Sequence, residues 1–541
     1  MRALHGLSDP LPWEVLRTTL DARGVVTETD LIALASRLGL PPVRLRAALA
    51  SFADLAEPTP RARVCRGTSC ELHGAPRLAE RVGSVARPAY CLGHCDRSPV
   101  ALDAVGRVQA LCATGPADGS PFDREPAPAP TTVRSLAREP IVTRRIGRGD
   151  FSRLADARAD GAWRVLEAAI RGGPEAVLEA IEASGERGRG GAGFSTGAKW
   201  RAARSAPGGP RYVVANGDEG DPGSFVDRVL LESDPHGVLE GLALCAFAVG
   251  ASEAIVFVRS EYPLAIARVE EAIADAERAG WLGSHVRGSG FSLRVRVFRG
   301  LGSYVCGEET ALLNAIEGRR GEVRLRPPYP TEVGLFGRPT VVNNVETLVN
   351  VPWIVERGPA AFAALGTPAS RGTKALCLNA TFPRPGIVEV PFGTSLRTVL
   401  EEVGGVPCDA AHLDALLVGG PMGSVLLPEE CDLPICYGAM AERGIELGHG
   451  GMVGVPAGSD LAALAVHLLT FMAEESCGKC VPCRAGSARA LALARADWRA
   501  NAEPLDRVLA VAADASLCAF GQAMPAPIRR LLALAAARSV S

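Results

Sequence analysis

Apolar residues recur at helical spacing in three stretches of the chain. In the N-terminal stretch, Gly39 ends one helix and Pro41-Pro42 opens the next, and the leucines at helical spacing are Leu16, Leu20, Leu31, Leu34, Leu38 and Leu45. Residues 174–184 (PEAVLEAIEAS) and 264–279 predict two further helices, each with one apolar face. From Asp460 onward nearly every segment is helical.

Short apolar runs between these helices predict strands. Residues 211–216 (RYVVAN) and 254–258 (AIVFV) read as buried strands, and their alternation with helices over 150–365 predicts an α/β layer domain. Residues 373–440 read as short strands with Gly and Pro turns, which favours a small α+β domain. Residues 61–114 read as small strands, and the Pro-, Ala- and Ser-rich stretch 115–132 predicts a linker.

The fold class expected from this pattern is α/β and multidomain. The predicted boundaries are an N-terminal module over 1–114, a linker over 115–143, an α/β domain over 144–370, a small α+β domain over 371–455 and a helical domain over 456–541. A length of 541 residues allows three to four domains at roughly 150 residues each.

Composition excludes several classes of protein. The chain is 47% hydrophobic and 22% charged, which is globular, and its net charge of −2 gives no sign of nucleic-acid binding. The apolar runs 239–251 and 461–473 are shorter than the about 20 residues of a membrane-spanning helix and predict buried helices. The N-terminus has no signal-peptide core, so we expect a cytoplasmic protein, able to dock on the cytoplasmic face of a membrane complex.

Eight of the 15 cysteines form two groups, and such spacing argues against a disulfide framework. In ESCGKCVPCRAG the spacing is C-x2-C-x2-C, and a distant cysteine in SLCAFG completes a set for a 4Fe–4S cluster: Cys477, Cys480, Cys483 and Cys518. The alternative is a four-cysteine zinc site, although zinc ribbons offer two C-x2-C pairs. In the N-terminal group, a C-x4-C and a C-x3-C pair suit a 2Fe–2S cluster, with zinc or a lost cluster as alternatives: Cys65, Cys70, Cys91 and Cys95.

A glycine-rich loop follows the helix over 174–184. Residues 188–193 (GRGGAG) spell G-x-G-x-x-G, but the dinucleotide fingerprint requires a preceding strand, and 193–199 (GFSTGAK) is not a Walker loop. What the sequence supports is a loop whose amides approach a phosphate, with Lys199 close by.

Acidic and amide side chains follow the predicted strands. Residues 216–228 (NGDEGDPGSFVDR) place carboxylates at a strand's C-terminal end, where open α/β sheets bind ligands, although a solvated acidic turn fits equally well. Residues 304–310 (YVCGEET) and 340–347 (TVVNNVET) add further acids and amides. Asn343 and Asn344 suit hydrogen bonding to a planar heterocycle, or equally capping and turns.

Six motifs in one order carry a family resemblance over residues 145–541: GRGGAGFSTGAKW, YVVANGDEGDPGSFVDR, CGEET, RPPYP, PTVVNNVET and ESCGKCVPCRAG. They resemble the NADH-binding flavoprotein subunit of respiratory complex I and the diaphorase subunits of NAD-dependent formate dehydrogenases and NAD-reducing hydrogenases. The N-terminal 110 residues, with CRGTSC and CLGHCDRSP, resemble the thioredoxin-like 2Fe–2S subunit that accompanies that flavoprotein, with a shorter gap between Cys70 and Cys91. This resemblance implies a thioredoxin-like N-terminal module, a β-grasp small domain and a 4Fe–4S helical domain.

The resemblance also implies residue roles. FMN would be held by the glycine loop and by the residues around the strand ends: Gly188, Arg189, Gly190, Gly191, Lys199, Asn216, Asp218, Glu219, Gly307, Glu308, Asn343, Asn344 and Thr347. NADH would contact Phe194, Asp221, Glu309, Arg326 and Tyr329, with Glu309 near the nicotinamide. Gly220 and Asp221 stand where the family has Ser and Glu, Arg326 and Tyr329 stand for Lys and Phe, and Ala202 replaces a second stacking Phe.

The implied chemistry is hydride transfer from NADH to FMN and single-electron transfer to iron–sulfur clusters, with no acid–base residue required. The second substrate belongs to another subunit. The segments RSEYPLAIA and AGWLGSHVRGSG favour an NAD-dependent formate dehydrogenase, and the fused N-terminal module resembles hydrogenase diaphorases, so hydrogenase and complex I remain alternatives. A non-catalytic relay or docking subunit is the alternative of another class.

Overall fold

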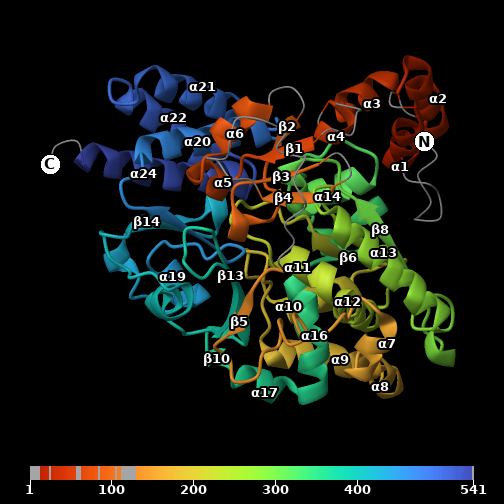
Figure 1. The fold of residues 1–541 in the computed structure, drawn as a ribbon. Helices are drawn as coiled ribbons and strands as arrows, with labels where there is room; N and C mark the ends of the chain where they lie inside the picture. The colour runs from red at the N-terminus through yellow and green to blue at the C-terminus, as the bar shows by residue number, and fades with distance from the viewer. Residues whose placement is uncertain are drawn as a thin grey trace.

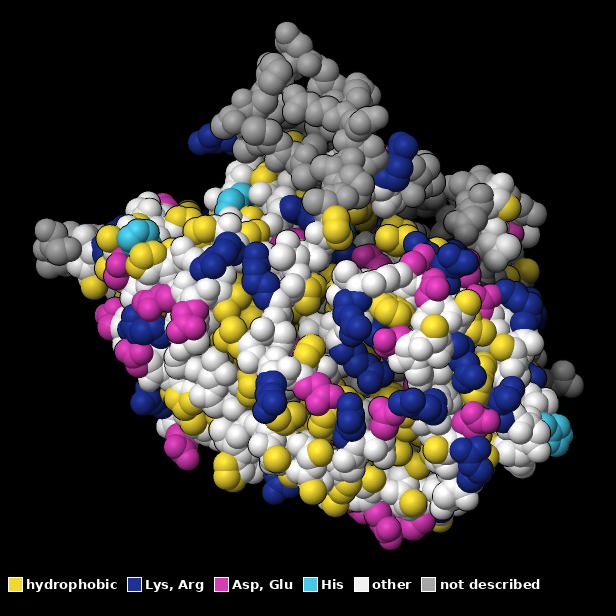
Figure 2. Space-filling model, turned by 60° about the horizontal axis from the view of Figure 1, so that its bottom comes forward, with side chains coloured by type: hydrophobic (Ala, Val, Ile, Leu, Met, Phe, Trp, Pro, Cys, Tyr) yellow, Lys and Arg dark blue, Asp and Glu magenta, His cyan; other side chains and the backbone are white. Residues whose placement is uncertain are grey.

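The computed structural model describes residues 12–23, 26–39, 41–50, 52–56, 62–82, 86–103, 106–110 and 130–538, shown in Figure 1. Most of the predicted linker, residues 115–129, lies outside the described residues. No helix in these ranges is long and apolar enough to cross a membrane. On the face drawn in Figure 2, basic and acidic side chains of the described residues are interspersed, as the small net charge leads one to expect.

A four-stranded parallel sheet, here called the parallel sheet, has the strand order β8-β7-β6-β9. Its strands are β6 (Tyr212–Gly217), β7 (Glu253–Val258), β8 (Arg294–Arg299) and β9 (Thr340–Asn344). Tyr212 pairs with Glu253 on one side and with Thr340 on the other. Strands β6 and β7 are almost wholly buried, which is why they read as continuous apolar runs.

Helices surround the parallel sheet. The central one is α12 (Pro235–Val249), nearly every residue of which is buried against α16 (Val345–Arg357), α9 (Pro174–Ser184) and α13 (Pro263–Arg278). The apolar run 239–251 is therefore mainly a core helix, as predicted. The other helices here are α7 (Leu154–Ala159), α8 (Arg164–Gly172), α10 (Thr196–Ser205), α11 (Val226–Ser233), α14 (Glu309–Ile316), α15 (Pro330–Val333) and α17 (Pro359–Ala363).

A second, six-stranded sheet, the mixed sheet, has the order β15-β14-β16-β12-β13-β5. Its strands are β12 (Thr373–Leu378), β13 (Gly386–Pro391), β14 (Leu413–Val418), β15 (Ser424–Leu426), β16 (Gly451–Pro456) and β5 (Val133–Ser135). Strand β5 lies in the predicted linker, yet it pairs in parallel with β13, with Ile387 opposite Val133. Smaller elements nearby are β10 (Gly366–Thr367), β11 (Ser370–Arg371), α18 (Leu396–Thr398) and α19 (Tyr437–Ala441).

The N-terminal segment forms helices and then a small sheet. The helices are α1 (Pro12–Arg23), α2 (Glu28–Leu38), α3 (Pro42–Leu49) and α4 (Ala53–Ala56), and the predicted break at Gly39 is a left-handed C-cap. The N-terminal sheet has the order β2-β1-β3-β4, with β1 (Ala62–Cys65), β2 (Ala86–Ala89), β3 (Val100–Leu102) and β4 (Val108–Ala110), and carries α5 (Thr68–Leu72) and α6 (Ala75–Val82). Trp13 and Phe52 pack in the same core as Phe257 and Phe298 of the parallel sheet.

The C-terminal segment is helical, as predicted. It contains α20 (Leu461–Glu475), α21 (Val481–Asp497), α22 (Ala502–Ala515), α23 (Ala519–Ala523) and α24 (Pro525–Arg538). Asp460 caps α20, because its side chain accepts the N–H of Ala463. Helix α20 packs against α21 and α24, and Tyr90 of the N-terminal segment joins the same apolar core. In Figure 1 the N-terminal sheet accordingly lies beside these helices.

Candidate functional site

The glycine loop joins α9 to α10 and lies against the end of β9. Gly191 and Gly193 have φ of +119° and +59°, a backbone conformation that side chains disfavour. A Cβ on Gly190 would stand 3.0 Å from the Cβ of Asn344, so the loop passes too close to β9 for a side chain there. The N–H of Arg189 donates to Oγ1 of Thr347 over 2.9 Å.

The side chains of Arg189 and Lys199 are engaged with protein groups. The buried Arg189 guanidinium pairs with Glu186, donates to the carbonyl of Arg371 over 2.9 Å, and leaves its Nη1 without a partner. Lys199 Nζ lies 3.0 Å from the carbonyl oxygen of Val342 and 3.3 Å from Glu309 Oε2. The loop's amides, rather than the Arg189 side chain, are thus the phosphate-binding feature of this segment.

The segments after β6 and β8 meet at the carboxyl ends of the strands. Asn216 Nδ2 donates to the carbonyl of Gly307 over 2.9 Å, and Asn216 Oδ1 accepts the N–H of Asp218. Burial raises the pKa of Asp218 well above its usual range, and its Oδ2 has no partner. Glu308 caps α14 by accepting the N–H groups of Thr310 and Ala311. Three motifs that are far apart in sequence therefore converge where open α/β sheets bind ligands.

The two asparagines of β9 have different surroundings. Asn344 is the N-cap of α16, because its Oδ1 accepts the N–H of Thr347, and its Nδ2 donates to Asp227 over 2.6 Å. Asn343 Nδ2 lies 3.8 Å from the buried Cys245 sulfur. The capping alternative weighed for these residues therefore describes Asn344, which still lies against the glycine loop.

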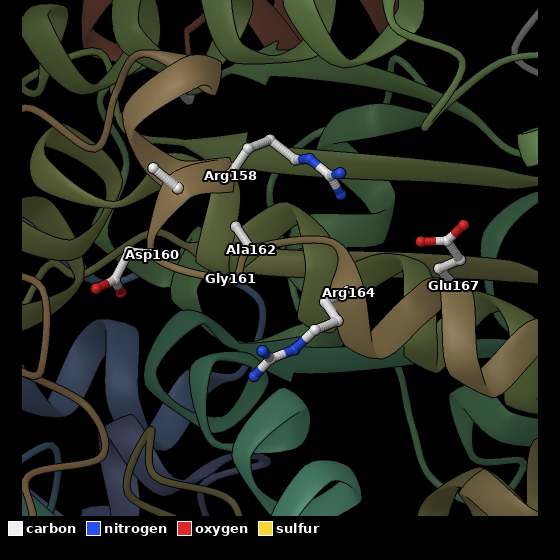
Figure 3. A pocket seen from close by; sticks show the side chains of 7 residues that line it. Arg158, Asp160, Gly161, Ala162, Arg164 and Glu167 are labelled. Carbon is white, nitrogen blue, oxygen red and sulfur yellow. The ribbon is translucent and has the colours of Figure 1, made fainter.

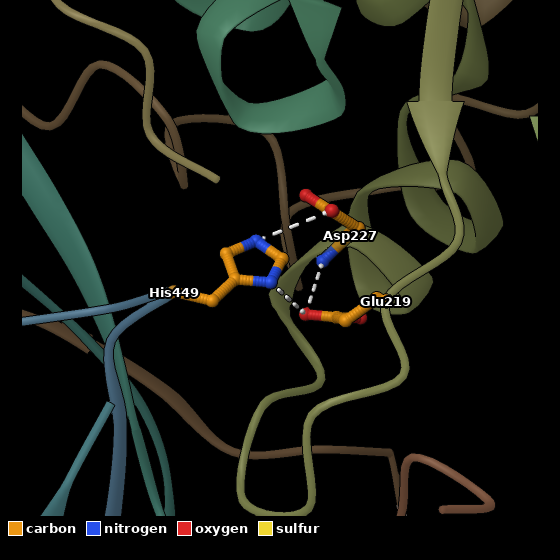
Figure 4. A group of neighbouring side chains, drawn as sticks. All are labelled: Glu219, Asp227 and His449. Carbon is orange, nitrogen blue, oxygen red and sulfur yellow. Dashed lines mark hydrogen bonds and ion pairs between the residues drawn. The ribbon is translucent and has the colours of Figure 1, made fainter. Parts of the chain in front are cut away.

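A buried acid–histidine group adjoins this wall (Figure 4). Glu219 Oε1 and Oε2 accept the N–H groups of Asp227 and Arg228 at the start of α11. His449, which lies just before β16, places Nε2 3.2 Å from Asp227 Oδ2 and Nδ1 3.8 Å from Glu219 Oε1. No sequence motif indicated His449, because its partners lie more than two hundred positions earlier in the chain.

The residues predicted to contact NADH include two exposed aromatics. Phe194 is 58% exposed and Tyr329 is 54% exposed, so both rings have a face available for stacking. Arg326 Nη1 lies 3.1 Å from Glu309 Oε1, so Glu309 is shared by Arg326 and Lys199.

Tyr304, which the sequence analysis did not single out, fixes Asp221. Its hydroxyl donates to the Asp221 carboxylate, and burial raises the pKa of Asp221 in spite of that hydrogen bond. A Cβ on Gly220 would stand 2.6 Å from the Tyr304 ring, which accounts for glycine at this position. The tyrosine directly precedes the CGEET motif, which was the available signal.

A surface hollow of about 500 Å³ lies elsewhere, between α7 and α8 (Figure 3). It is lined by Arg158, Ala159, Asp160, Gly161, Ala162, Arg164 and Glu167. None of the predicted site residues lines it, so it does not belong to this site.

The four C-terminal cysteines gather beside the same segment. Cys480 and Cys518 precede α21 and α23, and Cys483 lies in the first turn of α21. Burial, and then the like charges of the other three thiols, raise the pKa of Cys483 to about 11. Cys477 and Cys518 pack against Val305, Ala311 and Val323, which flank the CGEET motif. The cysteine site and the strand-end site are therefore neighbours.

The four N-terminal cysteines also lie together and are buried. The Cys91 sulfur is 4.0 Å from that of Cys65 and 3.4 Å from that of Cys95, and Cys70 donates to Ser98 Oγ over 3.3 Å. Each of the four residues is 1% exposed.

Two buried arginines connect this group to the strand-end site. Arg259 Nη1 donates to the carbonyls of Cys91 and Glu219 over 2.8 and 2.7 Å, and its Nη2 donates to that of Tyr90 over 2.7 Å. Arg228 Nε donates to the carbonyl of Gly93 over 2.8 Å.

Comparisons with known proteins identify the family. Residues 181–353 match the Nuo51 FMN-binding domain, and residues 463–535 match the iron–sulfur binding region of NADH-ubiquinone oxidoreductase-F. A second F-type subunit of NADH-quinone oxidoreductase from Rhizobium meliloti is 43% identical over 64% of this chain and 83% of that protein. The chain belongs to the NADH-quinone oxidoreductase F-type family. A further relative is the HndC subunit of the NADP-reducing hydrogenase of Solidesulfovibrio fructosivorans, 40% identical over 74% of this chain and 82% of that protein.

A solved structure resembles nearly the whole chain. A crystal structure of an NAD+-reducing NiFe-hydrogenase aligns with a TM-score of 0.82 and 30% identity, over 96% of this chain and 92% of that one. Membership of the F-type family gives this protein FMN and a 4Fe–4S cluster as cofactors and NAD(H) as substrate. All four C-terminal cysteines fall inside the matched iron–sulfur region, so the zinc alternative for them is set aside.

The strand-end site of this family member fits FMN. The glycine loop leaves its amides beside β9, and Asp218 Oδ2 and Arg189 Nη1 are buried polar atoms without a protein partner. Unpaired polar atoms of this kind are costly unless a ligand satisfies them.

Proposed function

We propose that this chain is an NADH:acceptor oxidoreductase subunit that exchanges electrons between NAD(H) and a partner subunit. The observation that carries the proposal is the contact between the two cofactor regions. The CGEET segment supplies Gly307 and Glu308 to the strand-end site, while its neighbours Val305 and Ala311 pack against Cys477 and Cys518. FMN, when bound, accepts two electrons as a hydride and passes them on singly.

The residue roles that we propose follow this geometry. The amides of Gly188, Gly190 and Gly191, with Lys199, would hold the phosphate, and Asn216, Asp218 and Glu219 would line the ring together with Gly307, Glu308, Asn343, Asn344 and Thr347. Phe194 and Tyr329 would stack on the adenine. Arg326 and Lys199 hold Glu309 and offset its negative charge, which keeps this carboxylate in place near the nicotinamide.

The test is electron transfer from NADH in the purified, FMN-loaded chain. We expect NADH to bleach the flavin absorbance and to reduce an artificial acceptor such as ferricyanide at many turnovers per second. A non-catalytic relay or docking subunit would keep the flavin oxidised in excess NADH, and that result would contradict the proposal.

For the N-terminal segment we propose a thioredoxin-like module with a 2Fe–2S cluster held by Cys65, Cys70, Cys91 and Cys95. Their mutual sulfur distances and full burial support a shared metal site. For residues 371–455 we propose a β-grasp fold. Anaerobically purified full-length protein should contain six irons per chain, and Cys91→Ser should remove two of them. Zinc in place of those two irons would contradict the assignment.

For the partner, we propose the catalytic subunits of a soluble NAD-linked complex in the cytoplasm. The hydrogenase structure supports a hydrogenase, because its similarity extends over the N-terminal module. A formate dehydrogenase is the second candidate, favoured by the segments RSEYPLAIA and AGWLGSHVRGSG, and complex I is the third. Subunits that co-purify with the tagged chain, followed by NAD+ reduction with hydrogen or formate, distinguish the three.

A further inference from the structure

His449 reaches into the FMN-binding domain from outside it. The residue lies just before β16 of the mixed sheet, whereas Glu219 and Asp227 lie within the matched FMN-binding range 181–353. Figure 4 shows the imidazole ring between the two carboxylates. All three side chains are buried, so this is an interaction between two parts of the fold and not a surface ion pair.

The ring touches two walls of the proposed flavin pocket. Glu219 is one of its partners, and Asn344 Nδ2 lies 3.2 Å from His449 Nε2 while donating to Asp227. On the other side, a Cβ on Gly191 of the glycine loop would stand 3.5 Å from the carbonyl carbon of Gly448. His449 is therefore one residue away from the pocket in both directions.

The acids around the ring favour its charged form. Burial alone lowers the pKa of His449, but the charge and hydrogen bond of Asp227 and the charge of Glu219 outweigh burial and raise it to about 9. Burial, together with the Asp227 charge, raises the pKa of Glu219 to about 7. The imidazole is thus cationic at neutral pH, and Asp227 is its main counter-charge.

The remaining titratable neighbours alter this balance only in part. Lys374 faces the ring from β12 and opposes its protonation, but its ammonium is paired with the buried Glu346. The Tyr262 hydroxyl, at the start of α13, donates to Glu219, and Asp221 feels the His449 charge at longer range.

We propose that His449 is a positioning residue that keeps a positive charge beside the FMN site and thereby favours flavin reduction. Hydride transfer from NADH gives the flavin two electrons and one proton and releases NAD+, so the flavin gains a negative charge until a further proton arrives from solvent. A buried cation nearby stabilises that charge, because the interior screens it weakly. The proposal rests on the assignment of Glu219 and Asn344 to the flavin pocket.

A divalent cation is the competing explanation for two acids and a histidine. Both oxygens of Glu219 accept backbone N–H groups, and those of Asp227 accept the N–H of Glu346 and the amide of Asn344. The carboxylates are thus already satisfied by protein donors, which favours the ion pair over a metal site.

The experiment measures the flavin reduction equilibrium of the full chain against a redox dye, so that it does not depend on NADH oxidation. We expect His449→Gln to lower the reduction equilibrium constant about tenfold, which is ~30 mV for a two-electron couple. His449→Lys keeps a positive charge and should stay within about twofold of wild type. His236→Gln, at another buried histidine of the same domain, should have no effect.

The pH dependence separates this role from a structural one. Above pH 9 the ring loses its proton when the flavin is oxidised and retains it when the flavin is reduced. Each pH unit should then cost wild type up to an additional tenfold in the reduction equilibrium, a steepening absent from His449→Gln. The proposal is overturned if the flavin that His449→Gln retains has the wild-type potential, or if a stoichiometric metal ion disappears with the histidine. Should His449→Gln bind no flavin, an unsteepened wild-type profile overturns it.

Discussion

Asp221 is the carboxylate that the resemblance places nearest the adenosine ribose. Tyr304 holds it through a hydrogen bond. NADP carries a phosphate on this ribose, and two like charges about 4 Å apart repel by ~4 kcal/mol at an effective dielectric of ~20. A quarter of that repulsion, ~1 kcal/mol, corresponds to roughly a fivefold preference for NADH. One relative belongs to an NADP-reducing hydrogenase, so the choice of nucleotide varies within the family.

We therefore expect Asp221→Asn to raise the ratio of kcat/KM for NADPH to that for NADH about fivefold, with less effect on NADH itself. Steady-state rates with both nucleotides provide the measurement. Asp409→Asn, at an exposed carboxylate of another part of the chain, should leave the ratio unchanged. An unaltered ratio in Asp221→Asn would show that another residue discriminates between the nucleotides.

Cys518→Ser should remove the 4Fe–4S signal and leave much of the FMN bound. Cys518 precedes α23 in the C-terminal helices, whereas the flavin residues lie at the parallel sheet. NADH should still reduce the flavin, and electron transfer to the partner should fail. Electron paramagnetic resonance and iron analysis measure the loss, with Cys408→Ser as the control because Cys408 belongs to neither cysteine group. Unchanged iron in Cys518→Ser would contradict the ligand assignment.

The residues that sequence alone revealed are those whose chemistry fixes their spacing. Cysteine ligands and phosphate-binding glycines must lie close together on one loop, so Cys477 and Gly190 stand out in the sequence. His449 and Arg259 act through side chains that meet partners from distant segments, and nothing in their local sequence marks them.

At the scale of elements, periodicity predicted the longer helices and the buried strands. Helix α9 matches residues 174–184, and β6 and β7 lie within one residue of their predicted bounds, because each has a strongly patterned apolar face. Strand β5 was not predicted. It has three residues and follows a Pro-rich stretch, and its place in the mixed sheet comes from β13 rather than from its own sequence.

Glu389 of β13 secures the segment that follows β5. Its carboxylate accepts the N–H groups of Ile141, Val142 and Thr143 and the hydroxyls of Thr143 and Thr373. Glu389→Gln replaces one acceptor oxygen by a donor that faces other donors. We expect it to lower the free energy of unfolding by about 2 kcal/mol, as for other buried donors left unpaired.

Chemical denaturation measures that loss, and amide hydrogen exchange should show faster opening at residues 141–143. Glu401→Gln, at a largely exposed acid, is the matched control and should cost less than about 0.5 kcal/mol. Equal stability of Glu389→Gln and wild type would mean that this network adds nothing to the attachment of the segment.

At the scale of the whole molecule, Arg259 connects the N-terminal segment to the flavin region through three carbonyl oxygens. Arg259→Gln cannot span all three. Because bonds from a charged donor are each worth roughly 1.5–3 kcal/mol, we expect amide exchange across residues 90–95 to accelerate at least tenfold. Arg384→Gln removes an exposed arginine that also donates to carbonyls, those of Glu401 and Glu402, and should leave this exchange unchanged. Wild-type exchange in Arg259→Gln would show that apolar packing alone holds the segment.

The complete burial of the four N-terminal sulfurs sets an order of events during biogenesis. Once Tyr90 and Cys91 rest on Arg259, an assembly protein has no path to thiols that are 1% exposed. Metal delivery must therefore precede the docking of this segment. A chain that closes before it receives its metal would remain permanently without it, and the cell would have to unfold or degrade it.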